Sequence, residues 1–143
     1  MKNLICISII LLVIIGCNTT KSTVFSTDKP KTESNDTIKI ANDELHYEVI
    51  IIEPGFDFWL HSTAYPRGFH SQTYLENKNY LYVSEWNNRV LQPQIYNPNL
   101  YEMTIQYDPN IDYGYEVNYL IYNYMIYFQN KYNQKLYGYV PTK

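Results

Sequence analysis

The sequence predicts an α+β fold: one small domain in which a few helices pack with a short two- or three-stranded sheet. Three observations support this prediction. An alternating apolar stretch at residues 45–53 is typical of a strand, and an apolar stripe with helical spacing runs through residues 72–91. The third is a nearly continuous apolar run close to the C-terminus, where seven tyrosines fall within residues 112–132. This run predicts a long aromatic C-terminal helix.

The strand predicted at residues 45–53 has the sequence LHYEVIIIE, in which every second residue from Leu45 to Ile51 is apolar. A Pro-Gly pair follows and stops it. Residues 56–64 predict a helix of one to two turns, because Phe56, Trp59 and Leu60 have the spacing i, i+3, i+4 and a proline comes soon after. A strand is thus expected to lead directly into a short helix.

Residues 72–91 fit a helix better than a strand. Ser71 or Thr73 can cap the N-terminus, and Glu85 stands four residues before Arg89 in the orientation that favours an ion pair. One apolar stripe lies on a single helical face: Leu75, Tyr82, Trp86 and Val90. Strand propensity is high only in the middle of the segment, NYLYVS. We therefore predict a helix here, with a strand as the alternative.

Two further stretches are less decisive. Residues 100–107, LYEMTIQY, stand between turns that contain proline and glycine, and they predict a short helix or a short strand. Residues 136–140, LYGYV, predict a closing strand beside the first one.

Residues 112–132 predict the long C-terminal helix. Asp112 can cap it, and Glu116 falls in the first turn, where the helix dipole favours a negative charge. A helix here carries two apolar stripes. The first, which we assign to the core, comprises Val117, Leu120, Ile121, Tyr124, Met125 and Phe128. The second comprises Tyr115, Tyr119, Tyr122 and Ile126. Burial of both stripes between two layers is the favoured interpretation, and a partner face on the second stripe is the alternative.

The N-terminus predicts an export signal. One positive charge at Lys2 precedes an apolar run of twelve residues, 4–15, which is interrupted only by Ser8. That length lies within the roughly 7–15 residues of a secretory signal and below the roughly 18 that a membrane-spanning helix needs. Residues 1–16 are therefore predicted to be a signal peptide.

The end of this run, Ile14-Ile15-Gly16-Cys17, resembles the lipobox of bacterial lipoproteins. The resemblance implies cleavage before Cys17 and acylation of that cysteine, so the contact with the membrane is made by lipid. The alternative is an ordinary secretory signal that is cut elsewhere. Because Cys6 lies inside the signal, the mature chain has no other thiol, which excludes internal disulfides, cysteine catalysis and cysteine-ligated zinc.

Residues 17–43 link this lipid to the domain. They are mostly Ser, Thr, Asn, Lys, Asp and Pro, and they have too few apolar side chains to offset the entropy of ordering, which predicts a disordered tether. Asn18 is not the aspartate associated with inner-membrane retention, so it permits sorting to the outer membrane. We expect a lipid-anchored protein of the bacterial envelope that faces the periplasm. Residues 44–143 are sufficient for one globular domain.

The charge pattern excludes nucleic acid as a partner. Without residues 1–16 the chain has 10 Lys and Arg against 14 Asp and Glu, a net charge of −4, and it contains no basic run. No cofactor is predicted, since the sequence has no phosphate-binding glycine loop.

Three stretches that span most of the mature domain carry a family resemblance: YLENKNYLYVSEWNNRV at 74–90, LYEMTIQYDPNIDYGYEVNYLIYNY at 100–124 and YFQNKYNQKL at 127–136. They resemble an uncharacterised family of small lipoproteins from Bacteroidota bacteria, a domain of unknown function. The resemblance supports the boundaries and the lipid anchor. It supplies no activity, cofactor or catalytic residue.

One cluster of side chains is a candidate ligand or partner face. Glu85, Trp86 and Arg89, with Tyr101 and Glu102 beyond the prolines, can place carboxylates, an indole and a guanidinium around a groove that suits a neutral polar ligand. The tyrosines of the second stripe belong to the same candidate face. An ion pair on a helix surface beside a buried tryptophan explains the same residues and is the favoured interpretation.

Metal and hydrolytic sites have less support. The chain contains three histidines: His46, His61 and His70. Their spacing matches no metal-binding pair, so no metal site is predicted. Asp108, Asp112 and Glu116 lie around an Asp-Pro turn without the calcium-loop pattern, and turn formation and helix capping account for all three.

These observations favour a non-enzymatic envelope lipoprotein that binds another envelope component or acts as an assembly or structural factor. No catalytic residue is predicted, because no nucleophile-and-base pair is recognisable. One alternative is recognition of a glycan or of peptidoglycan by exposed rings of Trp59, Trp86 and the tyrosines. A hydrolase that uses Glu85 or Asp108 as acid or base is the other.

Overall fold

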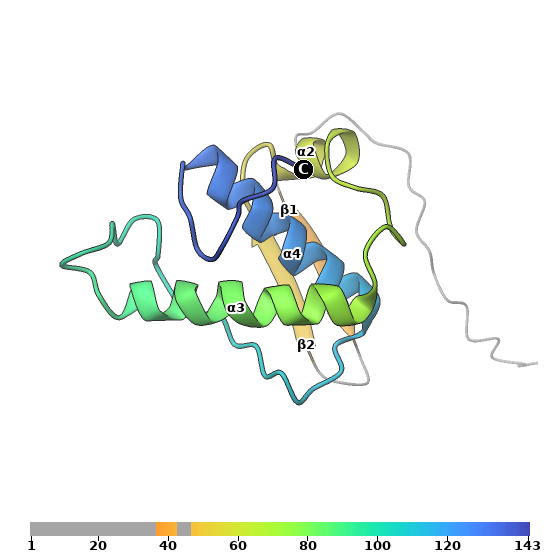
Figure 1. The fold of residues 1–143 in the computed structure, drawn as a ribbon, viewed down its shortest axis with the longest axis horizontal. Coiled ribbons are helices and arrows are strands. Elements are labelled where there is room, and N and C mark those ends of the chain that lie inside the picture. Colours follow the sequence, from red (N-terminus) through yellow and green to blue (C-terminus); the bar gives the residue numbers. More distant parts are fainter. Residues whose placement is uncertain (1–36, 43–46) are drawn as a thin grey trace, which may run out of the picture. The chain divides into compact units, whose positions relative to one another are not determined.

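The computed structural model of the chain describes residues 37–42 and 47–143 (Figure 1). The chain divides into two units, Met1–Glu33 and Ser34–Lys143, and every described residue belongs to the second. The predicted signal peptide at 1–16, Cys17, most of the predicted tether and His46 lie outside the described residues. Within the described part, no helix is both long enough and apolar enough to cross a membrane.

The second unit has the predicted α+β class. Its described elements are β1 (Thr37–Asn42), β2 (Tyr47–Ile52), α2 (Phe56–Ser62), α3 (Gln72–Val90) and α4 (Gly114–Lys131). The predicted strand, the short helix and the two long helices are confirmed, and α4 is the expected long C-terminal helix. The strand alternative for residues 72–91 is wrong, because α3 is continuous over 19 residues.

β1 and β2 form an antiparallel two-stranded sheet in which Ile38 pairs with Ile51 and Lys39 pairs with Ile50. Ile51 is buried in the core whereas Ile50 is exposed, so the sheet covers the core with one face only. β1 is not among the predicted strands, and it falls within the predicted tether, residues 17–43. The polar composition of that range hides a short apolar alternation that pairing with β2 stabilises.

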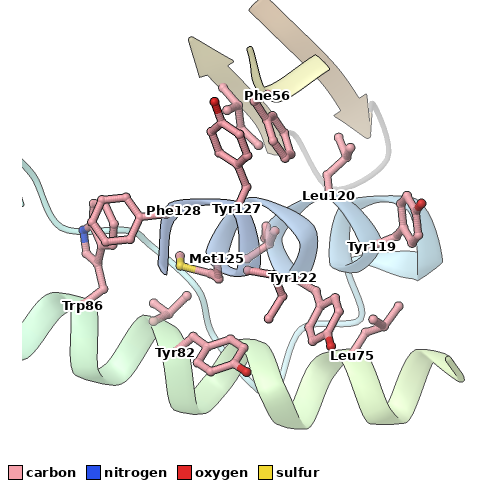
Figure 2. Packing of buried hydrophobic residues seen from close by; sticks show 14 of the residues in the cluster. Phe56, Leu75, Tyr82, Trp86, Tyr119, Leu120, Tyr122, Met125, Tyr127 and Phe128 are labelled. Atoms are coloured by element: carbon pink, nitrogen blue, oxygen red, sulfur yellow. The ribbon is translucent and has the colours of Figure 1, made fainter. Parts of the chain in front are cut away.

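α3 begins at a residue that the sequence offers as a cap. The Ser71 hydroxyl accepts a hydrogen bond from the Tyr74 backbone N–H (3.2 Å), which satisfies one of the free donors of the first turn. The predicted apolar stripe is buried at Leu75, Tyr82 and Trp86. Figure 2 shows these side chains directed toward α4.

α4 is the centre of the core (Figure 2). Tyr122 points toward α3, whereas Leu120 and Tyr127 point toward the strands on the other side. Five of the six residues of the first stripe are buried and Tyr124 is partly buried, and in the second stripe only Tyr115 keeps partial exposure. The prediction of a helix buried between two layers is confirmed. The tyrosines that crowd this segment are packing residues.

Residues 100–107 form neither of the two predicted elements, because side chains of α3 bind their backbone. The Trp86 indole N–H donates to the Met103 carbonyl (2.9 Å). The Asn87 side-chain amide donates to the Ile105 carbonyl and accepts from the Ile105 backbone N–H, both at 2.8 Å. The segment therefore follows α3 as an irregular chain.

The closing strand predicted at residues 136–140 is wrong. The described sheet contains β1 and β2 alone. Leu136 is buried, as its apolar character suggests, but its backbone N–H donates to the Gln129 side-chain oxygen (2.8 Å) and not to a strand. A buried glutamine of α4 thus replaces the expected ladder.

Candidate functional site

Trp86, the indole of the predicted ligand face, lies inside the core. Only 6% of its surface is exposed. Its ring packs against Phe128 and Tyr101, with centroid distances of 4.7 and 5.1 Å, and its N–H is bound to the Met103 carbonyl. The other tryptophan, Trp59, is partly buried. Neither indole presents the fully open face on which a sugar ring stacks.

Arg89 and Glu85 tie parts of the fold together. Nε of Arg89 donates to a Glu85 carboxylate oxygen (2.7 Å), and the terminal nitrogens donate to the Tyr101 hydroxyl (2.8 Å) and the Lys135 carbonyl (2.5 Å). The guanidinium also lies 4.7 Å from the centroid of the Tyr96 ring. A buried charge needs such partners. These contacts connect α3 to the loop that follows it and to the C-terminal segment.

The tyrosines of the second stripe are bonded within the unit. The Tyr119 hydroxyl donates to the Tyr65 carbonyl (2.8 Å), and the Tyr115 hydroxyl accepts from the Gly68 N–H (2.7 Å). Burial raises the pKa of the Tyr122 hydroxyl above its ordinary value, since the charged form would lose its hydration. Tyr119 and Tyr122 are buried, so they offer no open surface to a partner.

The acidic candidates have local structural contacts. Asp112 accepts the Gly114 N–H (2.9 Å) at the start of α4, and Asp108 accepts the N–H of Asn110 (2.8 Å) in the preceding turn. Glu116 forms an ion pair with Arg67 on the surface. Turn formation, one part of the predicted explanation, fits Asp108 and Asp112. The predicted capping by Asp112 is wrong, because the N-cap residue of α4 is Tyr113, which has no side-chain cap hydrogen bond.

The two described histidines have separate surroundings. His61 lies 3.3 Å from the carboxylate of Asp57 on the same helix, and His70 stacks on Tyr74 with 4.2 Å between ring centroids. Burial lowers the pKa of His70. In the part of the chain that the structure describes, no three His, Cys, Asp or Glu side chains gather so as to hold a metal ion.

The structure contains a groove that shares only Trp86 with the predicted ligand face. Its volume is about 510 Å³. Its described lining is residues 49–52 of β2, residues 103–106 of the irregular segment, Trp86 of α3, and Ile121, Tyr124 and Met125 of α4. The lining includes no charged side chain and only two with a polar end group besides the tyrosine and tryptophan, Thr104 and Gln106. The groove therefore suits an apolar ligand.

The rim of the groove is apolar and open to solvent. Ile50, Ile52 and Met103 are 51%, 72% and 71% exposed. Large apolar side chains gathered around a concave apolar surface are typical of binding sites. One feature of the sequence points here: a strand with four apolar residues in a row has apolar side chains on both faces. A two-stranded sheet over one core covers only one of these faces.

Comparison with known proteins gives a family without a known activity. Residues 4–143 match the family described as "Family of unknown function (DUF6146)". No curated protein and no solved structure matches the chain.

Proposed function

The chain belongs to DUF6146, a family of unknown function, and we propose that it is a lipid-anchored envelope lipoprotein whose folded unit is a non-enzymatic binding module. The observation that carries the binding role is the apolar groove between β2, α4 and residues 103–106. Its rim is exposed to solvent, whereas the other candidate side chains of the predicted ligand face, apart from Glu102, have partners within the fold.

The anchor is supported by the sequence of residues 2–17. In this proposal Cys17 carries the lipid, the residues after it form the link, and the folded unit is displayed at the surface of the outer membrane, facing the periplasm. A chain held at a membrane meets other envelope components at a high local concentration. A groove of moderate affinity is sufficient for such a role.

The binding role is tested with a matched pair of isoleucines. Ile52 lines the groove and Ile95 does not, yet both are 72% exposed. We expect Ile52→Ser to weaken binding of the neutral apolar dye N-phenyl-1-naphthylamine by about three- to tenfold, since the change removes about 1 kcal/mol of apolar contact. Ile95→Ser should leave the affinity unchanged.

The measurement is a fluorescence titration of the unacylated mature chain, residues 17–143 with Cys17→Ser, which retains the whole unit Ser34–Lys143. Absence of saturable dye binding by this chain would argue against the groove as a binding site. Equal losses in the two variants would do the same, because they would mean that the dye binds any exposed apolar side chain.

A further inference from the structure

The groove runs along one edge of β2. Consecutive residues of a strand point to opposite faces of a sheet, and all four residues 49–52 line the groove. A space that is lined by consecutive residues, whose side chains point to opposite faces, lies at the edge of the strand. The other edge is taken over this stretch, because Ile50 and Ile51 pair with Lys39 and Ile38 of β1. The groove therefore follows the edge of β2 that β1 leaves open.

This open edge carries backbone groups that a further strand can use. Among the described residues the sheet consists of β1 and β2 alone, and outside their ladder no backbone–backbone hydrogen bond involves residues 49–52. Unpaired N–H and C=O groups at a strand edge pair readily with another extended chain. In such strand addition the main chain supplies affinity, and pockets for alternate side chains supply specificity.

The wall of the groove opposite β2 is fixed by hydrogen bonds to α3. Residues 103–106 form this wall, and α3 binds their backbone through Trp86 and Asn87 with three hydrogen bonds. The wall cannot move onto β2 without losing these bonds. Between the two lies a slot with Met125 and Ile121 of α4 among its apolar lining residues.

One carboxylate near the groove is available to a ligand. Glu102 precedes the wall residue Met103, is exposed, and has no ion pair among the described residues. Its charge reaches Tyr124, which lines the groove. Burial raises the pKa of the Tyr124 hydroxyl, and the negative charges of Glu53 and, more weakly, of Glu102 raise it further. Glu53 is already paired with Lys131.

The unit Ser34–Lys143 as a whole is negatively charged, like Glu102. Ser34–Lys143 contains 12 Asp and Glu against 7 Lys and Arg, a net charge of −5. An acidic surface attracts a basic ligand and repels an acidic one.

We propose that the groove binds an extended peptide segment of a partner protein, which adds as a third strand to the open edge of β2 and directs a lysine or arginine to Glu102. Alternate apolar side chains of this segment fill the groove, and the side chains between them face solvent. The inference rests on the proposed function of the groove as a binding site, and it names the ligand class.

The first test uses charge reversal. The probe is the fluorescein-labelled peptide Lys-Val-Thr-Ile-Thr-Val, titrated into the unacylated mature chain and followed by fluorescence anisotropy. We expect saturable binding that falls by about two- to fivefold in Glu102→Lys, the range for an exposed ion pair. A peptide with glutamate in place of lysine should bind Glu102→Lys better than the unaltered chain. Glu76→Lys, a charge reversal on α3 outside the groove lining, should change neither affinity.

The second test addresses the backbone. Only one edge of the peptide pairs with β2, so N-methylation of alternate residues in one register should weaken binding by more than about tenfold, and methylation in the other register should have little effect. Equal effects in both registers would overturn strand addition.

The outcomes separate this inference from the proposed function. Dye binding without peptide binding overturns the inference and leaves the binding role standing, whereas loss of both overturns both. A dimer in analytical ultracentrifugation that the peptide does not dissociate would place a second copy on the edge. Displacement of the dye by palmitate but not by the peptide would place an acyl chain in the groove. Either result overturns the peptide inference.

Discussion

Replacing Phe128 by alanine is expected to destabilise the folded unit by about 3–5 kcal/mol, the usual cost of removing a buried phenylalanine ring from a core. Only 2% of Phe128 is exposed. Its ring lies 4.7 Å from the centroid of Trp86 and 5.6 Å from that of Tyr101, so it joins α4 to α3 and to the irregular segment. A loss of this size is a large part of the roughly 5–15 kcal/mol that stabilises a typical domain.

The measurement is the midpoint of urea unfolding of the unacylated mature chain, followed by circular dichroism. Phe58→Ala is the matched control, because Phe58 is 77% exposed on α2. It should change the free energy of unfolding by less than about 0.5 kcal/mol. Similar midpoints for the two variants would contradict the placement of α4 at the centre of the core.

Cys17→Ala is expected to abolish acylation, because the proposed attachment uses the thiol of this residue. In cells fed a labelled fatty acid, the variant should carry no label, and its mass should still include residues 1–16. Cys6→Ala provides the control, since Cys6 is the only other cysteine and lies in the apolar run of the proposed signal peptide. That variant should be labelled and processed like the unaltered chain.

Retained labelling of the Cys17→Ala variant would refute the lipoprotein assignment. The variant is also expected to lose its attachment to the membrane. Each buried methylene of an acyl chain contributes about 0.8 kcal/mol, so one chain gives marginal attachment and two or three give stable anchoring. The variant should therefore lose the lipid part of its membrane association altogether.

The long helices could be predicted from the sequence because local rules determine them. α3 has a serine cap, a single apolar stripe and an ion pair at i, i+4, and each of these features lies within the segment itself. α4 is apolar around most of its circumference, which is possible only for a helix covered on two sides. Its tyrosines fit there because hydroxyls such as those of Tyr119 and Tyr127 reach backbone carbonyls.

The elements that were missed depend on contacts between distant residues. β1 is a strand because β2 pairs with it, and the polar residues around it conceal this in the sequence. Residues 100–107 have strand-like composition, but Asn87 and Trp86 bind the backbone that a strand partner would need. Leu136 is held by Gln129 in the same way. A side chain that binds backbone groups in place of a neighbouring strand leaves no periodic pattern in the sequence.

The candidate site was predicted only in part for a related reason. Glu85, Trp86 and Arg89 are close together, as expected, but the rings and carbonyls that surround them come from residues far along the chain. An internal ion pair and a ligand clamp use the same residue types, so burial alone distinguishes them. The groove arises where an open strand edge meets α4, and the sequence does not record which edge of a strand stays open.

The central claim, that the binding surface is the groove beside β2 and not the second tyrosine stripe of α4, is tested most directly by NMR. Backbone amide shifts of the unacylated mature chain are followed while N-phenyl-1-naphthylamine is added. The largest changes are predicted at residues 49–52 and 103–106, with Ile95 unaffected. Shift changes that centre on the backbone amides of the exposed aromatic residues Phe69 and Tyr74, with unchanged shifts for the β2 amides, would contradict this claim.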